Sequence, residues 1–288
     1  MAGPVPSIVA VIPVHNRVEQ TLRCLRSIAA GTVVPDVVVV DDGSHDGTAR
    51  RVPQEFPGVV VLLADGNEWW AGATNIGVEY ALANGADYVL TVNNDGVLDA
   101  RAVEALLQAA QSSARVLAAA QRHDLDDPER CWSAGAFVDW DRRFPIRAAP
   151  VGGDDPFPVD ASGANLLLLP RQCFEEIGRF DARRLPQNWA DFDFQLRAKA
   201  AGWRVLSVPS SRVYVDLSTV GPRLDRTTRL SDAVRLLTAF RSPFYPPHLW
   251  RFFRRHAPAR RLPAVLVYRY LAVVLSVARH YGVPIRRR

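Results

Sequence analysis

Three clusters of polar side chains stand where carboxylates and amides could bind a charged ligand. They are residues 15–16 (His-Asn), 41–42 (Asp-Asp) and 93–95 (Asn-Asn-Asp), and each directly follows an apolar run. Carboxylates accept hydrogen bonds from base N–H groups and ribose hydroxyls, and their oxygens hold hard divalent cations that keep positions open for phosphate. A further carboxylate, Asp191, could act as a base. Nucleotide, metal and base together indicate group transfer from a nucleotide-activated donor.

The apolar runs before these clusters predict strands of one sheet. Ile8–Val14, 37–40 and Tyr88–Val92 are short and rich in β-branched residues, which is typical of strands buried on both faces. Apolar residues at helical spacing follow at 18–28 and 73–83. This alternation predicts a doubly wound, mostly parallel α/β sheet, whose ligands bind outside the carboxyl ends of the strands. The three clusters are therefore expected at the same edge.

The rest of the body gives further, less regular signals. A third buried strand is expected at 59–63, and a loop-rich stretch around 124–158. The other expected elements are helices at 102–110, 174–177 and 191–201 and strands at 116–120, 160–169 (after an initial turn) and 203–208.

Composition narrows the class of protein. The chain has 288 residues, of which 48% are hydrophobic and 23% charged, as in ordinary globular proteins. Its three cysteines are widely spaced and form neither a disulfide framework nor a metal motif, which favours a reducing cytoplasm. The first strand is not followed by GxGxxG, and no GxxxxGK[ST], HExxH or GxSxG occurs. These absences exclude the usual dinucleotide, phosphate-loop, zinc-protease and serine-hydrolase sites.

Charge divides the chain into two parts. Residues 233–288 hold 12 arginines and no acidic residue, whereas residues 1–232 hold 23 basic and all 30 acidic side chains, a net charge of −7. The acidic body argues against a nucleic-acid partner. The tail, with a helix expected at 230–240 and an apolar run at 265–278, has two interpretations. It is either an amphipathic segment on an anionic membrane, peripheral at the inner face of the cell membrane, or a helix packed on the body.

Six segments, in order along the chain, resemble the family 2 inverting glycosyltransferases of the GT-A fold. The resemblance runs from about residue 8 to 221, and the Trp-Trp stretch is similar to a bacterial, rhamnosyltransferase-like branch. The segments are 13–16 (PVHN), 38–48 (VVVDDGSHDGT), 67–75 (NEWWAGATN), 90–95 (LTVNND), 162–164 with 178–181 (SGA, GRFD), and 186–205, which contains Trp189-Ala190-Asp191.

The resemblance implies a role for each matching position. Asp191 would be the catalytic base, and Asp95 would bind Mg²⁺ or Mn²⁺ that bridges the donor diphosphate. Asp41 would contact the nucleotide base, with Asp42 or His15 lining that pocket. The remaining substrate or nucleotide positions that it implies are Pro13, Asn16, Gly72, Asn75, Asn94, Gly163 and Trp189.

This chain departs from the family pattern at three places. Asn93-Asn94-Asp95 keeps one carboxylate of the DxD-type metal motif, and Ala190 stands where many relatives have Glu. Where relatives place a His metal ligand, Asp216 could supply an oxygen instead. Among neighbouring residues, Asp193 is expected to be structural, and Arg197 and Arg179 are expected to pair with Asp193 and Asp181. Trp69 and Trp70 either cover the donor or pack.

The sequence thus predicts a metal-binding GT-A domain at 1–223, with a nucleotide-sugar half (1–98) and an acceptor half (99–223), and a basic helical tail at 224–288. The expected reaction is inverting transfer of a hexosyl group from dTDP-rhamnose or a UDP-sugar to a hydroxyl of a glycan, glycolipid or related lipid-linked acceptor, in polysaccharide biosynthesis. Two alternatives stay open. One is a non-catalytic scaffold that binds the nucleotide sugar; the other is a sugar-phosphate nucleotidylyltransferase, although the Gly-rich loop with Arg and Lys that it needs after the first strand is absent. Pairing of two subunits through the tail as a homodimer also stays open.

Overall fold

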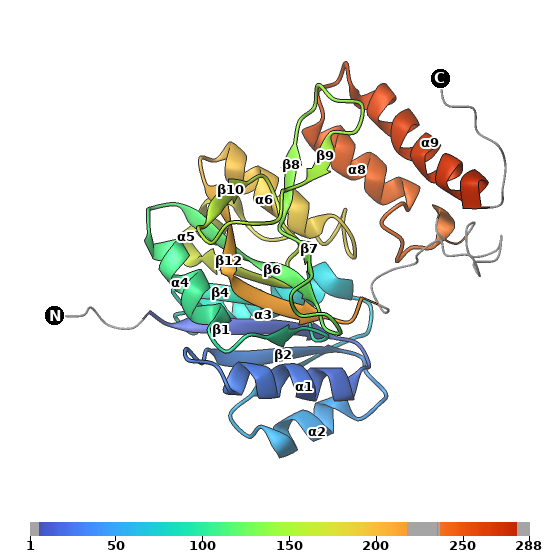
Figure 1. The fold of residues 1–288 in the computed structure, drawn as a ribbon. Coiled ribbons are helices and arrows are strands. Elements are labelled where there is room, and N and C mark those ends of the chain that lie inside the picture. Colours follow the sequence, from blue (N-terminus) through green and yellow to red (C-terminus); the bar gives the residue numbers. More distant parts are fainter. Residues whose placement is uncertain (1–5, 218–234, 236, 281–288) are drawn as a thin grey trace.

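The computed structural model describes residues 6–217, 235 and 237–280, and a ten-stranded mixed sheet forms its centre (Figure 1). The strand order is β10-β12-β6-β11-β4-β1-β2-β3, with β5 paired to β12 and β7 to β6. The strands are β1 (Ile8–Val14), β2 (Asp36–Asp42), β3 (Val60–Ala64), β4 (Tyr88–Val92), β5 (Val97–Leu98), β6 (Val116–Asp124), β7 (Cys131–Ser133), β10 (Phe157–Val159), β11 (Leu166–Pro170) and β12 (Arg204–Val215); β8 (Ala136–Val138) and β9 (Ile146–Ala148) form a separate pair.

The nucleotide-side half of the sheet is parallel, as the sequence predicts. β1 pairs in parallel with both β2 and β4, and β2 pairs in parallel with β3. The sheet becomes mixed at β11, which runs antiparallel to β4 and β6, while β6 and β12 are parallel. Because the carboxyl ends of β1, β2 and β4 point the same way, the polar clusters that follow them lie at one edge.

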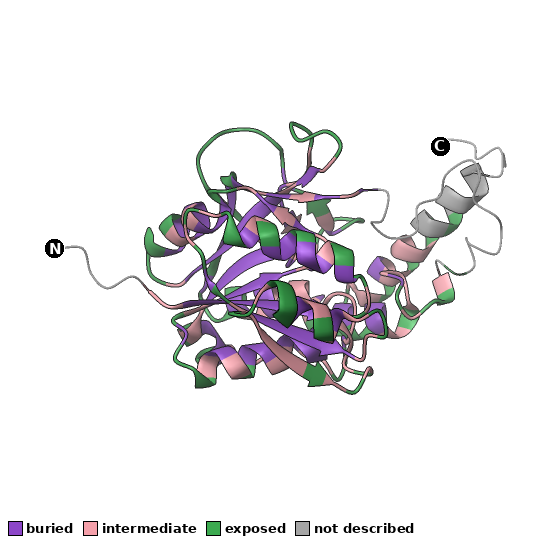
Figure 2. Cartoon of the chain, turned by 90° about the horizontal axis from the view of Figure 1, so that it is seen from below, coloured by how far each residue is buried: buried purple, intermediate pink, exposed green. Residues whose placement is uncertain are grey.

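Helices cover both faces of the sheet, and successive residues of β1 alternate between two cores. Val9 and Val11 pack in the core that includes α3, α5, α6 and α8, whereas Ala10 and Ile12 pack in the core that includes α1, α2 and α4. Figure 2 shows the sheet as the most buried part of the chain. The helices are α1 (Val18–Ala29), α2 (Thr48–Glu55), α3 (Trp69–Ala83), α4 (Ala102–Gln111), α5 (Arg171–Ile177), α6 (Ala190–Ala200), α8 (Pro246–His256) and α9 (Leu262–His280).

Two differences from the sequence predictions have clear physical causes. The strand expected to be buried at 59–63 is β3 at the sheet edge, where Leu63 is 72% exposed, because β3 pairs with β2 on one side only. The helix expected at 73–83 begins earlier, at Trp69, because the carboxylate of Asp42 on β2 accepts the N–H groups that open it. Helix α2, which contains Pro53, was not anticipated from the sequence.

The basic tail is partly integrated into the body. Leu249, Phe252 and Phe253 of α8 are buried in the same core as α3 and α6, so this part of the tail packs on the body. Helix α9 buries Val265 but exposes other apolar side chains, and in the part of the chain that the structure describes no helix has the length and hydropathy to cross a bilayer. The boundary predicted at residue 223 and most of the helix predicted at 230–240 lie outside the described residues.

Candidate donor site and catalytic carboxylate

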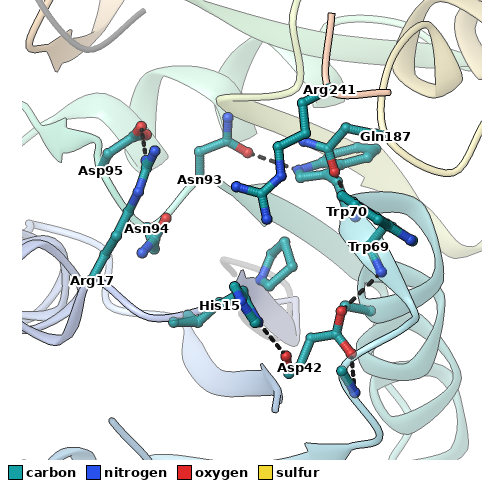
Figure 3. Close-up of a pocket in the computed structure, with 14 residues that line it drawn as sticks. His15, Arg17, Asp42, Trp69, Trp70, Asn93, Asn94, Asp95, Gln187 and Arg241 are labelled. Atoms are coloured by element: carbon teal, nitrogen blue, oxygen red, sulfur yellow. Dashed lines mark hydrogen bonds and ion pairs between the residues drawn. The ribbon is translucent and has the colours of Figure 1, made fainter. Parts of the chain in front are cut away.

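A cavity of about 280 Å³ opens at the carboxyl ends of β1, β2 and β4. All three polar clusters of the sequence contribute to it, and it also receives residues from α3 and from the second half of the chain (Figure 3). Its lining residues are Pro13, Val14, His15, Arg17, Asp42, Gly66, Trp69, Trp70, Ala73, Asn93, Asn94, Asp95, Gln187 and Arg241.

The turn after β1 is shaped by two residues with left-handed backbone. Asn16 and Arg17 have φ of 58° and 71°, and the Asn16 N–H donates to Ser44 Oγ at 2.7 Å. Asn16 Oδ1 accepts the His45 N–H at 3.0 Å, so this side chain joins two loops and lies outside the cavity lining. His15 Nδ1 donates to the carbonyl oxygen of Asp42 at 2.6 Å, which holds its ring against the cavity.

The two carboxylates that end β2 are both buried, but they have different hydrogen-bond partners and only one of them lines the cavity. Asp42 accepts the N–H groups of Gly66 and Trp69, each at 2.9 Å, and thereby builds the turn that leads into α3. Asp41 accepts the Ser44 N–H at 2.9 Å and does not line the cavity. Asp42 therefore borders the cavity while most of its hydrogen-bonding capacity is used by the backbone.

The 93–95 cluster forms the opposite wall. Trp70 Nε1 donates to Asn93 Oδ1 at 2.9 Å, and Asn94 Nδ2 donates to Thr21 Oγ1 at 3.1 Å. Asp95 Oδ2 forms an ion pair with Arg17 at 3.0 Å, whereas its Oδ1 is buried and has no hydrogen-bond partner. An unpartnered carboxylate oxygen is what a hard cation binds.

The protein itself offers few ligands for such a cation. Asp95 and Asp216 line one adjoining hollow of about 460 Å³, and the described residues contain no group of three acidic, His or Cys side chains suited to a metal. The donor set therefore fits a divalent ion that takes one or two oxygens from the chain and the rest from phosphate and water.

Asp191 stands at the start of α6, directly after Trp189 and Ala190. Its Oδ1 accepts the Phe192 N–H at 2.9 Å and its Oδ2 accepts the Ala164 N–H at 3.2 Å. Burial raises the pKa of Asp191 above its ordinary value, although those two N–H groups and the guanidinium of Arg122 act in the opposite direction. A carboxylate with a raised pKa is a stronger base than an ordinary aspartate.

A short series of hydrogen bonds joins Asp191 to the cavity. The residue after Ala164 is Asn165, whose carbonyl oxygen accepts the N–H of Asn93 at 3.0 Å, and Asn93 lines the cavity. Gln187, four residues before Asp191, also lines the cavity and accepts the Trp70 N–H at 3.3 Å. The carboxylate thus follows directly on a loop that borders the cavity.

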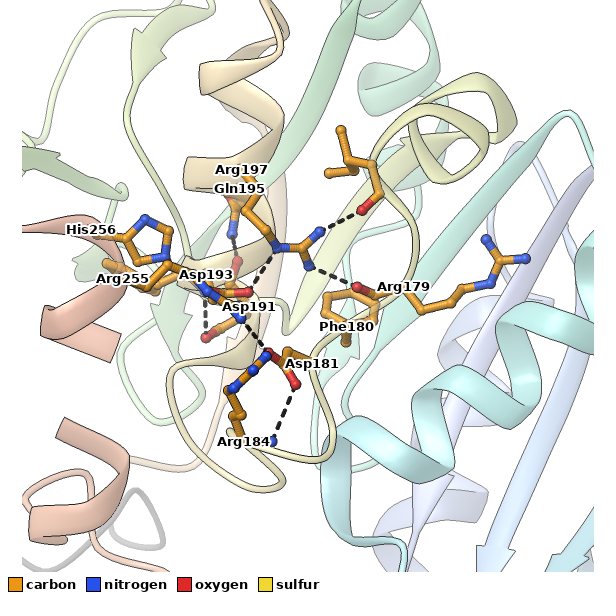
Figure 4. A network of polar contacts seen from close by, with 12 residues as sticks. Arg179, Phe180, Asp181, Arg184, Asp191, Asp193, Gln195, Arg197, Arg255 and His256 are labelled. Atoms are coloured by element: carbon orange, nitrogen blue, oxygen red, sulfur yellow. Dashed lines mark hydrogen bonds and ion pairs between the residues drawn. The ribbon is translucent and has the colours of Figure 1, made fainter. Parts of the chain in front are cut away.

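Asp193, two residues further along α6, lies in a network of charged side chains (Figure 4), and its pKa is shifted in the direction opposite to that of Asp191. Its side chain is fully buried and meets Arg197 at 2.9 Å, Arg255 at 2.8 Å and His256 at 2.8 Å. Burial alone would raise its pKa, but hydrogen bonds from His256, Arg255 and Arg197 lower the pKa of Asp193 to about 2. This confirms the structural role expected for Asp193 and its pairing with Arg197.

The pairing expected between Arg179 and Asp181 was wrong. Arg179 Nε instead binds Glu79 Oε1 on α3 at 2.6 Å. Asp181 pairs with Arg255 at 2.6 Å and with Arg184 at 3.2 Å. Because Arg255 lies on α8, this basic partner of Asp181 comes from a helix far away in the sequence.

Besides Asn16, Asp41, Asp191 and Asp216, four further sequence-derived positions lie outside the cavity lining. Asn75 exchanges two hydrogen bonds with the backbone of Phe180, at 2.9 and 3.1 Å, and Trp189 donates to the carbonyl oxygen of Pro243 at 2.9 Å. Gly72 is buried within α3, and Gly163 adjoins the guanidinium of Arg122. Conversely, Arg17, Gln187 and Arg241 line the cavity without having been selected from the sequence. Adjacency to His15-Asn16 could have indicated Arg17, whereas no local signal marks the other two.

These features define the class of protein. The structure is similar to that of GalNAc-T7, solved with UDP, GalNAc and Mn²⁺, with a TM-score of 0.65 at 15% identity over 99% of this chain and 60% of that one. The chain accordingly has the mixed α/β architecture of the GT-A glycosyltransferase fold, as the sequence predicts.

The family follows from the sequence comparisons. Residues 9–164 match glycosyl transferase family 2, and the chain belongs to that family. It is 32% identical over 182 residues to galactofuranosyltransferase GlfT1 of Mycobacterium tuberculosis (strain CDC 1551 / Oshkosh), covering 62% of this chain and 60% of that protein. It is 28% identical over 222 residues to N-acetylglucosaminyl-diphospho-decaprenol L-rhamnosyltransferase of the same strain, covering 66% and 70%. The chain thus spans less than two thirds of the galactofuranosyltransferase.

Proposed function

We propose that this protein is an inverting glycosyltransferase that moves a hexosyl group from a nucleotide sugar to a hydroxyl of a glycan or lipid-linked acceptor. The observation that carries the proposal is a cavity at the carboxyl ends of β1, β2 and β4, bordered by the loop that leads into Asp191, a half-buried carboxylate with a raised pKa. Family membership supports the same reaction class. The name of the mycobacterial rhamnosyltransferase favours a lipid-linked acceptor and transfer of rhamnose, and that of the second relative favours transfer of galactofuranose. The donor that we propose is dTDP-rhamnose or a UDP-sugar.

In the proposed reaction Asp191 removes the proton of the acceptor hydroxyl. The acceptor oxygen then bonds to the anomeric carbon on the face opposite the nucleotide. The bond from that carbon to the diphosphate oxygen breaks, and its electron pair leaves with the nucleoside diphosphate. The proton stays on Asp191, and the configuration at the anomeric carbon is inverted. A positioned base of this kind contributes roughly 10²- to 10⁴-fold to the rate.

Asp95, with Asp216, would hold Mg²⁺ or Mn²⁺ beside the diphosphate. The buried, unpartnered Oδ1 of Asp95 supports this assignment. When bound, the ion stabilises the negative charge that develops on the leaving diphosphate. His15 and Asp42 would border the nucleotide, with Pro13 and Asn94 completing that side of the cavity.

We predict that one of UDP, dTDP and GDP raises the melting temperature of the full chain, and that Mn²⁺ enlarges the shift. The Asp95→Asn variant should lose the part that depends on Mn²⁺, because its remaining oxygen is a weaker cation ligand. Thermal denaturation with and without Mn²⁺ measures this, and Asp36→Asn, an exposed carboxylate at the start of β2, is the matched control. An equal Mn²⁺-dependent shift in Asp95→Asn and native protein would refute the metal role of Asp95.

We further propose that the protein works in the cytoplasm, peripherally at an anionic membrane. The exposed face of α9 carries Val267, Leu271 and Val274 at helical spacing, and exposed Trp250 on α8 lies 5.8 Å from the guanidinium of Arg254. Apolar side chains beside arginines are typical of interfacial helices. The three free cysteines agree with a reducing compartment. The homodimer and the division into two halves at residue 98 and a tail from 224 stay predictions.

Sedimentation with vesicles tests the membrane proposal. We expect the native chain to sediment with phosphatidylglycerol vesicles but not with phosphatidylcholine vesicles, and Leu271→Glu to weaken that binding. Leu271 is already 45% exposed, so the substitution should not unfold the protein; Val34→Glu, at a residue 58% exposed in the β2-proximal loop, is the control. Binding of Leu271→Glu equal to that of native protein would argue against α9 as the contact.

A further inference from the structure

Two arginines enter the donor cavity from opposite parts of the chain. Arg17 follows β1, and its left-handed backbone, with φ of 71°, directs the side chain toward Asp95. Arg241 precedes α8 and reaches the cavity from the other side (Figure 3). Neither takes part in the proton transfer, and of the two only Arg17 contacts the proposed metal ligand, through its ion pair with Asp95.

Arg241 is held in place by contacts that involve both its backbone and its side chain. Its carbonyl oxygen accepts a hydrogen bond from Asn188 Nδ2 at 3.1 Å, within the loop that leads to Asp191. Its guanidinium lies 5.3 Å from the ring centroid of Trp69, and the ring of Phe240 lies 4.4 Å from the same Trp69. These contacts position a cation at the cavity wall.

The charge of Arg241 has no acidic counterpart among the described residues. None of the ion pairs found there includes Arg241, whereas Arg17 is paired with Asp95. The other carboxylate of the cavity, Asp42, accepts hydrogen bonds from the N–H groups of Gly66, Glu68 and Trp69. A positively charged group without a partner therefore faces a space of the size of a small ligand. Guanidinium groups bind phosphate oxygens with paired hydrogen bonds.

We propose that Arg241 and Arg17 bind the diphosphate of the nucleotide sugar from two sides of the cavity. This inference rests on the proposed function and extends it to the residues that stabilise the charge on the leaving diphosphate. Breaking the bond to the anomeric carbon adds one negative charge to the diphosphate, so contacts to it strengthen in the transition state. With a single carboxylate in the 93–95 cluster to hold a cation, the two guanidinium groups supply further positive charge to the leaving diphosphate. When the diphosphate is bound, its oxygens compete with the carboxylate of Asp95 for the guanidinium of Arg17.

Calorimetric titration of the full-length chain with a nucleoside and with its diphosphate separates the two parts of the ligand. Uridine and UDP, or thymidine and dTDP, are titrated into native protein and into Arg241→Gln, once with EDTA and once with Mn²⁺. Loss of charged hydrogen bonds should weaken diphosphate binding by roughly 10- to 100-fold in both conditions. Nucleoside binding should stay within about twofold, since the expected contact is to phosphate.

Further variants make the result specific. Arg17→Gln should also weaken binding of the diphosphate. Arg241→Lys should recover part of the affinity, because an ammonium group keeps the positive charge but lacks the paired N–H donors of a guanidinium. Arg254→Gln, beside the exposed Trp250 on α8 and outside the cavity, is the matched control and should bind like native protein.

Each alternative outcome has a defined meaning. Unchanged diphosphate affinity in Arg241→Gln would overturn the arginine proposal and leave the proposed function intact. An equal loss of nucleoside and diphosphate binding would also overturn it, because Arg241 would then act only by holding Trp69. Absence of any nucleotide binding by the native chain would overturn both this inference and the proposed function.

Discussion

Replacing Asp191 by Asn is expected to lower the rate of glycosyl transfer by roughly 10²- to 10⁴-fold while nucleotide binding stays unchanged. The amide keeps the size of the side chain, and its one oxygen can still accept one of the two N–H groups, of Phe192 and Ala164, that the carboxylate accepts. It cannot take a proton from the acceptor hydroxyl at neutral pH. Steady-state rates with a donor and acceptor that the native protein uses, together with calorimetric nucleotide affinity, measure the effect.

Two further observations keep this prediction specific to a base. Asp36→Asn, the exposed control, should transfer sugar at the native rate. Because Asp191 must be ionised to act and burial raises its pKa, the rate of the native enzyme should fall as the pH drops through a value above the ordinary aspartate pKa of 3.8. Turnover of Asp191→Asn within a few-fold of the native rate would contradict the assignment.

Replacing Asp193 by Ala is expected to lower the free energy of unfolding by about 3 kcal/mol. The carboxylate is fully buried among Arg197, Arg255 and His256, so its removal leaves the partly buried Arg197 without its counter-charge and Arg255 with Asp181 as its remaining one. The two arginines are 22% and 29% exposed, which places the expected loss at the lower end of the range for broken buried pairs. Urea denaturation followed by circular dichroism measures it.

The same network sets an acid limit on stability. Its contacts lower the pKa of Asp193 to about 2, so their stabilisation is present above the ordinary value of 3.8 and is lost as the pH falls toward 2. Glu104→Gln, which removes the exposed pair with Arg101, should leave the urea midpoint almost unchanged. An Asp193→Ala midpoint equal to that of Glu104→Gln would show that α8 is not held to α6 by this carboxylate.

Much of the donor side could be predicted from the sequence because strand and ligand group are adjacent along the chain. Ile8–Val14 is a continuous apolar run, and all seven of its residues are buried. The polar residues that follow such strands must lie at the sheet edge, since parallel strands end together. For this reason His15, Asp42 and Asn94 were placed at the cavity without any tertiary information.

Contacts between distant segments could not be predicted in this way. Gln187 and Arg241 reach the cavity from the second half of the chain, and nothing in their immediate neighbours marks them. The partner of Arg179 proved to be Glu79, 100 residues away, instead of the nearby Asp181. Asn75 is committed to the backbone of Phe180, which a motif cannot reveal.

By itself, the sequence determined the fold class and which strand ends meet, because both follow from local hydrophobic periodicity and turn positions. Only the tertiary structure decided how the carboxylates differ: Asp191 and Asp193 are two residues apart, yet burial raises one pKa while three partners lower the other. It also decided that α8 of the basic tail packs on the body. Burial and charge pairing depend on which segments come together in space, and that is a property of the whole chain.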